Sequence, residues 1–173
     1  PQYMADGFAY FLGFYLAEGC RSITQGRRYI HVDNQNRQLL VDLARDLGFS
    51  NTPYHARGGV YRLSLRSDEL YEQLGEKKRA WEKRIPRDFL VNASQSELES
   101  LFMGMMDGDG TWTQNKLDTT SEDLADDFQE LCIRLGFMAY KRLTRGWSLG
   151  RNPSGNLSFG RPMWRVSYRD PET

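Results

Sequence analysis

The sequence contains one stretch twice, and this repeat constrains the fold more than any other feature. In each copy an apolar segment runs into an acidic residue and a glycine follows directly: residues 11–19 contain Glu18, and residues 102–110 contain Asp109. The second copy follows the first at an offset of 91 residues. Each copy predicts a helix that ends at its glycine. We therefore expect a chain made of two related halves.

Small residues recur at every fourth position in both predicted helices. Residues four apart lie on one face of a helix, and a stripe of small side chains lets two helix backbones approach closely. We therefore expect the two helices to pack against each other along these stripes. The stripes consist of Ala9, Gly13 and Ala17 in the first copy and of Ser100, Gly104 and Gly108 in the second.

This packing would bring Glu18 and Asp109 together at the C-terminal ends of the helices, where the helix dipoles disfavour negative charge. Two carboxylates about 5 Å apart repel by roughly 3 kcal/mol at an effective dielectric constant near 20. A divalent cation would reverse the sign of these interactions, and Mg²⁺ binds carboxylate and carbonyl oxygens together with water. The pattern therefore predicts a Mg²⁺ site. The alternative is that each acid simply precedes the glycine that ends its helix.

The two stretches resemble the signature of the LAGLIDADG homing endonucleases. The second copy matches it closely, with Gly104 at the packing position and Asp107 and Asp109 near its end. The first copy departs from it, because Leu16 stands where the signature has its first aspartate and Glu18 replaces the second. The resemblance covers nearly the whole chain and is closest to the monomeric two-motif type, in particular to the endonuclease domains associated with inteins.

The resemblance implies an enzyme that hydrolyses both strands of a long, asymmetric double-stranded DNA target across the minor groove and leaves short 3′ overhangs. It implies that Glu18 and Asp109 are metal-binding catalytic acids, with Mn²⁺ able to replace Mg²⁺ and Ca²⁺ binding without supporting cleavage. The carbonyl groups of Ala17 and Gly108 are expected as further ligands. A lysine before an Ile-Pro pair precedes the second motif in the intein-associated branch, so the resemblance gives Lys83 a catalytic role; a solvated linker charge is the alternative.

A second internal match lies outside the helices. Residues 61–66 and 164–169 both read aromatic, Arg, aliphatic, Ser, apolar, Arg. This alternation predicts strands that carry their Arg and Ser side chains on one face, and antiparallel ribbons can enter the major groove, where such side chains read base edges. The residues expected to contact DNA on these and neighbouring strands are Arg27, Tyr29, His31, Arg62, Ser64, Arg66, Thr113, Asn115, Lys141, Arg145, Arg165, Ser167 and Arg169.

The predicted fold class is α+β. Two pseudo-symmetric αββαββ halves would pack their motif helices at the centre, and two antiparallel sheets would form a DNA-binding saddle. We expect one endonuclease domain over residues 1–173, with pseudo-repeats at about 1–75 and 94–173 joined by a linker at 76–93.

Local signals place the turns and helix ends. Glycines predict hairpin turns at residues 25–26 and 58–59. Asp33 or Asn34 is expected to cap the helix that follows the first hairpin. The segment 146–160 contains Gly, Asn and Ser and is expected to be a long loop.

Composition bounds the remaining possibilities. The formal net charge is zero, which counts against a nucleic-acid-binding protein, but eight Arg and Lys and no acid lie between Cys132 and Arg169. His31 and His55 are far apart and the two cysteines lack metal-type spacing, so a zinc site is not expected. A reducing intracellular location, cytoplasmic or nucleoid-associated, is expected. The longest apolar run is too short to cross a bilayer and no signal peptide is evident, so no membrane partner is expected.

Two other functions remain open at this point. One is an RNA-splicing maturase of the same fold, which would bind structured intron RNA without cutting DNA. The other is a DNA-binding regulator that has lost catalysis, which Leu16 and Glu18 would allow. Acids at both motif ends favour the nuclease. We interpret the chain as a monomeric, intein-derived piece, with an excised domain, a degraded intein and a free-standing product as the open contexts.

Overall fold

The computed structural model describes residues 5–173 and consists of two compact units. One unit comprises the chain up to Lys77 together with Asn92–Asp109, and the other comprises Lys78–Val91 with Gly110–Thr173. Each unit contains one four-stranded antiparallel sheet. The predicted α+β class with two antiparallel sheets is therefore confirmed. None of the described helices is both long and apolar enough to cross a membrane.

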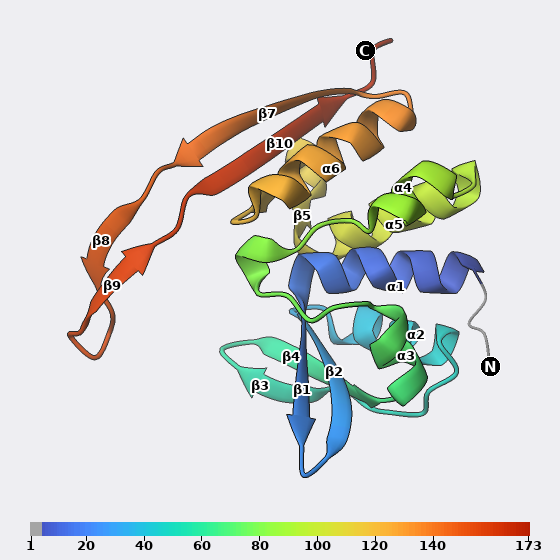
Figure 1. Ribbon diagram of the computed structural model, residues 1–173, viewed down its shortest axis with the longest axis vertical. Helices are drawn as coiled ribbons and strands as arrows, with labels where there is room; N and C mark the ends of the chain where they lie inside the picture. Colours follow the sequence, from blue (N-terminus) through green and yellow to red (C-terminus); the bar gives the residue numbers. More distant parts are fainter. Residues whose placement is uncertain (1–4) are drawn as a thin grey trace. The chain divides into compact units, whose positions relative to one another are not determined.

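In the first unit the sheet has the strand order β1-β2-β4-β3 and packs α2 and α3 against one face (Figure 1). Ile30 and Leu65 are cross-strand partners, as are Val32 and Leu63, and all four side chains are buried on this face. Apolar residues alternate along the strands, so the opposite face stays open. The elements are α1 (Ala5–Glu18), β1 (Gly19–Thr24), β2 (Arg27–Asn34), α2 (Arg37–Asp46), β3 (Tyr54–Arg57), β4 (Val60–Arg66), α3 (Asp68–Gln73) and α5 (Gln95–Asp109).

The two predicted hairpin turns are confirmed. Residues 25–26 and 58–59 all have positive φ angles, as two-residue turns between antiparallel strands require. The predicted cap of the next helix is wrong, because β2 continues through Asp33 and Asn34 and the side chain of Asn36 caps α2 instead.

The two motif helices α1 and α5 pack directly on each other. A Cβ atom at Gly13 would lie 2.2 Å from the carbonyl oxygen of Leu101, and one at Gly104 would lie 2.0 Å from the carbonyl oxygen of Tyr10. Both distances are far below van der Waals contact, so any side chain at these two positions would force the backbones apart. The predicted packing of the motif helices is confirmed. Ala9, Leu101 and Met105 are buried in this unit, and Ser100 is partly buried.

The order of these contacts shows that the two helices run in the same direction. Gly104 faces Tyr10 and Phe14, and Gly108, one turn later, faces Phe14 and Ala17. Contacts that advance together along both chains mean parallel helices. The C-terminal ends of α1 and α5 therefore coincide.

In the second unit the strand order is β5-β6-β10-β7, and α6 lies along one face of this sheet (Figure 1). Val166 of β10, Leu117 of β6 and Phe128 of α6 form part of its buried core. The elements are η1 (Ala80–Glu82), α4 (Arg87–Asn92), β5 (Gly110–Thr111), η2 (Trp112–Gln114), β6 (Lys116–Thr119), α6 (Glu122–Arg134), β7 (Met138–Arg145), β8 (Ser148–Arg151), β9 (Leu157–Gly160) and β10 (Met163–Arg169).

The two sheets repeat each other in strand order and in register. In both, the strand that begins directly after a motif helix is at one edge and pairs with the next strand, which pairs with the strand that carries the Arg-Ser-Arg alternation. The glycine after each motif acid starts an equivalent row of paired residues. These rows are Gly19, Val32 and Leu63 in the first sheet and Gly110, Leu117 and Val166 in the second.

The expected loop at 146–160 is wrong. Strands β8 and β9 form a hairpin in which Leu149 pairs with Phe159, and the hairpin continues from β7 and β10 beyond the end of α6 (Figure 1). The glycine, asparagine and serine residues that suggested a loop are divided between its turn, where Gly155 has a φ of 82°, and the two strands themselves. Pairing along a ribbon stabilises strands that have little apolar burial of their own.

We predict that Gly104→Ala lowers the free energy of unfolding by about 1–3 kcal/mol, because the new Cβ would overlap the Tyr10 carbonyl oxygen. The better helix propensity of alanine offsets only about 1 kcal/mol of the steric cost. Urea denaturation measures the change. Gly150→Ala, at an exposed position with no atom within 4 Å of the added Cβ, is the control; equal stability of both variants would contradict the close helix contact.

Candidate active site and nucleic-acid face

Glu18 and Asp109 end the two motif helices at the place where these helices come together. A Cβ at Gly108 would lie 2.8 Å from the Cβ of Ala17, and each of these residues directly precedes one of the two acids. Both acidic residues are exposed. The steric contact between the helices, rather than any attraction between the acids, therefore brings two carboxylates to one end of one helix pair.

The donor groups at this end fit a hard divalent cation. Carboxylate oxygens are available from Glu18 and Asp109, and the last carbonyl groups of a helix, here including those of Ala17 and Gly108, lack partners within the helix. Mg²⁺ and Mn²⁺ prefer such oxygen ligands with water completing the shell. Among residues 5–173 no group of three or more His, Cys, Asp or Glu side chains could hold a metal, so a metal here would depend on these two acids, carbonyls and water.

Asp107 is tied to the scaffold. The Tyr10 hydroxyl donates a hydrogen bond to its Oδ2 at 2.7 Å, and the Asn34 amide donates to its main-chain carbonyl at 3.1 Å. Burial, together with the adjacent Asp107 carboxylate, raises the pKa of Tyr10, so the phenol stays a donor. The counterpart of Asp107 in the first copy, Leu16, is buried and apolar. Asp107 thus joins α5 to α1 and to the end of β2.

A buried arginine that the sequence analysis did not single out lies on β1, the strand that follows Glu18. The Arg21 side chain donates from Nε to the Tyr15 hydroxyl at 3.0 Å and from Nη1 to the carbonyls of Tyr71 and Gly75 at 2.7 and 2.9 Å. It therefore holds the C-terminal end of α3 against β1. Residues two apart in a strand share a face, so Arg21 lies on the same buried side of β1 as Gly19. This alternation is the sequence signal that could have identified Arg21 as buried.

The open face of the first sheet carries the predicted DNA-contacting residues of the first half. Cross-strand partners share a face of a sheet, and His31 pairs with Ser64 while Tyr29 pairs with Arg66. These side chains point away from the buried row described above. Arg27, Tyr29, His31, Arg62, Ser64 and Arg66 all lie on this face by the register.

His31 is held in a chain of polar contacts on that open face. Its Nε2 lies 2.8 Å from Ser22 Oγ and its Nδ1 lies 2.8 Å from Ser64 Oγ, while its ring stacks on Tyr29. Burial, and then the positive charge of Arg62, lower the pKa of His31. The imidazole is therefore neutral at neutral pH.

Arg62 forms a double hydrogen bond with its cross-strand partner Asp33. The distances are 2.7 Å from Nε to Oδ1 and 2.8 Å from Nη2 to Oδ2. The hydrogen bond to Asp33 raises the pKa of Arg62 further. This arginine is thus fixed in one orientation and its charge is balanced.

The open face of the second sheet repeats this arrangement. Arg165, Ser167 and Arg169 alternate with the buried Val166 and Tyr168 of β10. Arg165 donates to its cross-strand partner, the carboxylate of Asp118, from Nε at 2.7 Å and from Nη2 at 3.0 Å.

Lys141 was expected on the open face of β7, and this expectation is wrong. It pairs with Val166 and faces α6, where its ammonium group contacts Asp126 and Glu122 and lies 4.8 Å from the centroid of the Trp164 ring. The alternation of β7 puts Lys141 on the helix-covered side, and the helix acids neutralise its charge.

The other predicted contacts of the second half, Thr113, Asn115 and Arg145, are exposed. Thr113 is in η2 and Asn115 follows it with a φ of 48°, so this segment is a tight turn and no regular strand. Arg145 is exposed at the end of β7 and donates to the Arg161 carbonyl at 3.1 Å.

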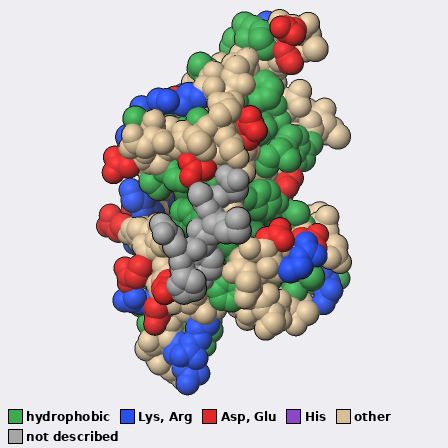
Figure 2. Space-filling view, turned by 90° about the vertical axis from the view of Figure 1, so that its right-hand side faces the viewer, with side chains coloured by type: hydrophobic (Ala, Val, Ile, Leu, Met, Phe, Trp, Pro, Cys, Tyr) green, Lys and Arg blue, Asp and Glu red, His purple; other side chains and the backbone are tan. Residues whose placement is uncertain are grey.

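Charges of both signs mix on the surface outside these strands. On the face shown in Figure 2, Asp and Glu side chains lie among Lys and Arg side chains, and basic side chains gather at the lower end, where the β1–β2 hairpin turns. Arg27 and Arg28 begin β2 directly after that turn. The zero net charge therefore coexists with local basic regions.

The family model of the LAGLIDADG-like domain matches residues 7–78. A crystal structure of an I-DmoI variant in complex with its target DNA in the presence of Mg has a TM-score of 0.64 at 13% identity, over 95% of this chain and 89% of that chain. I-WcaI bound to its DNA recognition sequence has a TM-score of 0.55 at 14% identity, over 96% of this chain and 77% of that chain. The chain has the fold of the LAGLIDADG homing endonucleases. The family resemblance inferred from the two motif copies is confirmed.

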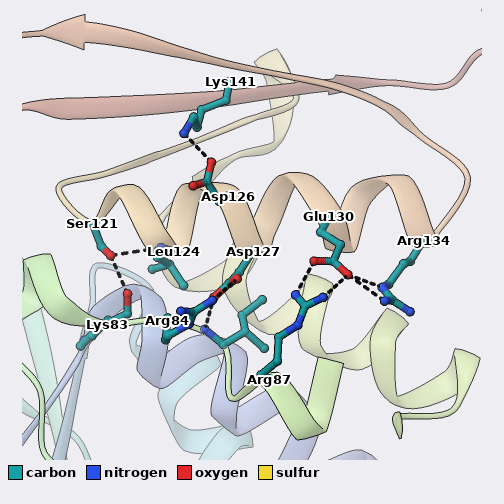
Figure 3. Close-up of polar contacts among 11 residues, drawn as sticks. Lys83, Arg84, Arg87, Ser121, Leu124, Asp126, Asp127, Glu130, Arg134 and Lys141 are labelled. Atoms are coloured by element: carbon teal, nitrogen blue, oxygen red, sulfur yellow. Dashed lines mark hydrogen bonds and ion pairs between the residues drawn. The ribbon is translucent and has the colours of Figure 1, made fainter. Parts of the chain in front are cut away.

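Within this fold, residues 83–87 of the second unit are fastened to α6 (Figure 3). Ser121 donates its hydroxyl to the Lys83 carbonyl at 2.5 Å, and the Ile85 amide donates to Asp127 Oδ2 at 2.9 Å. Arg84 pairs with the same carboxylate at 3.0 Å. Burial raises the pKa of Asp127, which these hydrogen bonds oppose. The backbone around Lys83, whose side chain is buried, is therefore fixed to the helix.

We predict that Asp127→Ala lowers the free energy of unfolding by about 1–3 kcal/mol, because the buried Ile85 amide loses its acceptor. Asp126→Ala, one residue earlier on α6, removes only an exposed partner of Lys141 and should cost less than about 1 kcal/mol. Urea denaturation of both variants measures the difference. A cost as small for Asp127 as for Asp126 would show that the segment is not held by this carboxylate.

Proposed function

We propose that this chain is a site-specific endonuclease that cleaves both strands of double-stranded DNA. The observation that carries the proposal is the pair of exposed carboxylates, Glu18 and Asp109, at the joined C-terminal ends of α1 and α5. Two negative charges at helix C-termini do not stabilise the fold. The arrangement is explained if the two carboxylates bind a ligand.

The similar structures support the substrate. I-DmoI and I-WcaI, which share this fold, were both determined in complex with their DNA targets, and I-DmoI was also determined with DNA and Mn. Each motif acid of this chain is followed directly by the first strand of a sheet, and each sheet has an open face that carries Arg and Ser side chains. β-Ribbons of this kind suit the major groove.

Glu18, Asp109 and the carbonyls of Ala17 and Gly108 would hold Mg²⁺ or Mn²⁺ against the scissile phosphates. A divalent cation bound there activates water and stabilises the charge that develops on the leaving oxygen. The two acids supply negative oxygen ligands on a rigid helix pair, which fixes their spacing. Lys83 would organise water or balance phosphate charge, and the fastening of its backbone to α6 limits where its side chain can reach.

One chain supplies both acids and both sheets, so a single copy contains the parts of a double-strand nuclease, and we expect it to act as a monomer in a reducing, intracellular setting. The two open faces differ in sequence: His31 pairs with Ser64 in the first sheet, and Lys116 pairs with Ser167 in the second. We therefore expect an asymmetric target, cut across the minor groove to leave short 3′ overhangs.

We predict that Asp109→Asn and Glu18→Gln each reduce DNA cleavage by more than about 100-fold while leaving DNA affinity unchanged within about threefold. Losing groups that merely support a metal ligand already costs 10–100-fold, so losing a ligand should cost at least as much. Cleavage of a plasmid library with a randomised insert measures activity, and gel shifts measure affinity.

Glu99→Gln, which removes an exposed acid from the same helix α5, is the charge-matched control and should cleave normally. Loss of affinity in Asp109→Asn would make Asp109 structural. DNA binding without cleavage by the unmodified chain would favour a regulator, and preferential binding of structured RNA would favour a splicing maturase.

We also predict that cleavage stops in EDTA, returns with Mg²⁺ or Mn²⁺, and does not return with Ca²⁺, which should still increase DNA affinity. The reason is that the two carboxylates repel each other and the phosphates until a cation binds between them. Cleavage that persists in EDTA after extensive dialysis would rule out the proposed role of the acids.

A further inference from the structure

The two open faces share one feature beyond their Arg-Ser-Arg pattern: an arginine locked to a cross-strand aspartate. Arg62 and Asp33 form this pair between β4 and β2, and Arg165 and Asp118 form it between β10 and β6. In both pairs Nε donates to Oδ1 and Nη2 donates to Oδ2. Matching strands, matching register and matching atoms make the two pairs equivalent within their own sheets.

This mode of pairing leaves half of each guanidinium available. An arginine has five N–H groups in a rigid planar fork, and the Nε–Nη2 edge is used by the aspartate. The edge formed by Nη1 and the second N–H of Nη2 remains, and within residues 5–173 neither Nη1 atom of Arg62 or Arg165 donates a hydrogen bond. Two parallel N–H groups match the O6 and N7 acceptors of guanine in the major groove.

We propose, on the basis of the function proposed above, that Arg62 and Arg165 each read one guanine of the DNA target, with Asp33 and Asp118 as their positioning residues. Each aspartate fixes the fork in one plane and cancels its charge. A neutralised, oriented fork loses much of its attraction to phosphate and keeps its two-point match to a base edge.

The neighbouring arginines provide the contrast. Arg66 and Arg169 lie four residues further along β4 and β10, are exposed, and form no ion pair among the described residues. Exposed guanidinium groups without a carboxylate partner suit phosphates, whose recognition carries no sequence information. Each open face thus contains one arginine suited to a base and one suited to the backbone.

The register also places the guanines within the target. Gly19, the residue after Glu18, pairs with Val32, and Asp33 follows Val32. Gly110, the residue after Asp109, pairs with Leu117, and Asp118 is the next residue. Each arginine–aspartate pair therefore lies beside the strand start that follows a motif acid. The guanines should be close to the cut positions in each half-site, rather than at the outer ends.

A purely structural role explains the two pairs less well. Each pair is partly exposed, with side-chain exposures of 35% and 21% for Arg62 and Asp33 and of 25% and 32% for Arg165 and Asp118. Ion pairs at such positions contribute little to stability. Their loss should leave the fold intact, so a change in base preference in these variants can be assigned to recognition and not to unfolding.

The test begins with selection of the target from a randomised DNA library by the full chain in EDTA, where it binds without cutting. Affinity is then measured with each of the four bases at every target position. We expect one position in each half-site where guanine is preferred by about 5- to 150-fold, the range that a two-point base contact provides. Replacing that guanine by 7-deazaguanine, which lacks the N7 acceptor, should cause most of the same loss.

Arg62→Ala should abolish the guanine preference at one of these positions only, and Arg165→Ala should abolish it at the other. Asp33→Ala should keep or increase overall affinity while it weakens the same preference, a result that a structural role does not produce. Arg62→Lys, which keeps the charge, should also lose the preference. Arg66→Ala is the matched control: it should weaken all sequences equally and lower the slope of affinity against salt by about one.

Three results would overturn the inference. Uniform weakening of all sequences by Arg62→Ala would make Arg62 a phosphate contact. If Asp33→Ala left the base preference at every target position unchanged, Asp33 would not be a positioning residue. If the target positions affected by the arginine variants did not prefer guanine, the arginines would not read guanine. Each of these leaves the nuclease proposal standing, whereas failure of the unmodified chain to select any DNA sequence would overturn both.

Discussion

The contact between α1 and α5 at Gly13 and Gly104 is the constraint on which the remaining structure depends. No side chain fits between the backbones there, and the parallel direction of the helices makes their ends coincide. Glu18 and Asp109 are consequently fixed by sterics against their own repulsion. Such an arrangement places unfavourable charge at a defined position, and functional sites commonly depart in this way from the rules that stabilise folds.

Charge balance on the open faces follows a different logic. A net charge of zero would leave little long-range attraction for DNA, yet the acids are not spread at random. Asp33 and Asp118 neutralise arginines on the open faces, and Asp126 neutralises Lys141 on the covered face of the second sheet. Under the proposed function, arginines without a carboxylate partner, such as Arg66 and Arg169, would provide the attraction to phosphate. Part of the acidic content therefore orients basic side chains, so net charge alone is a poor guide to partner class here.

The two halves repeat the same plan with different details. Strand order, register and the arginine–aspartate pair are shared, whereas Asp107 bonds to Tyr10 and its counterpart Leu16 is buried. The second half also extends β7 and β10 into the β8–β9 ribbon. The features that the two halves share are the motif acids and the strands that follow them. The features that differ lie outside these acids and strands. Under the proposed function, this pattern corresponds to one chemistry applied to two unlike half-sites.

The sequence by itself determined the repeat, the motif helices and their glycine contact. It also determined the turns at residues 25–26 and 58–59 and the alternation of the Arg-Ser strands. Each of these features depends on local periodicity, or on a position where only glycine fits the backbone. Only the tertiary structure decided that Lys141 faces α6, that residues 146–160 pair as strands, and that Arg62 and Arg165 are held by Asp33 and Asp118. These depend on which segments become neighbours, and a strand's partner and covered face are set by long-range packing that no local pattern records.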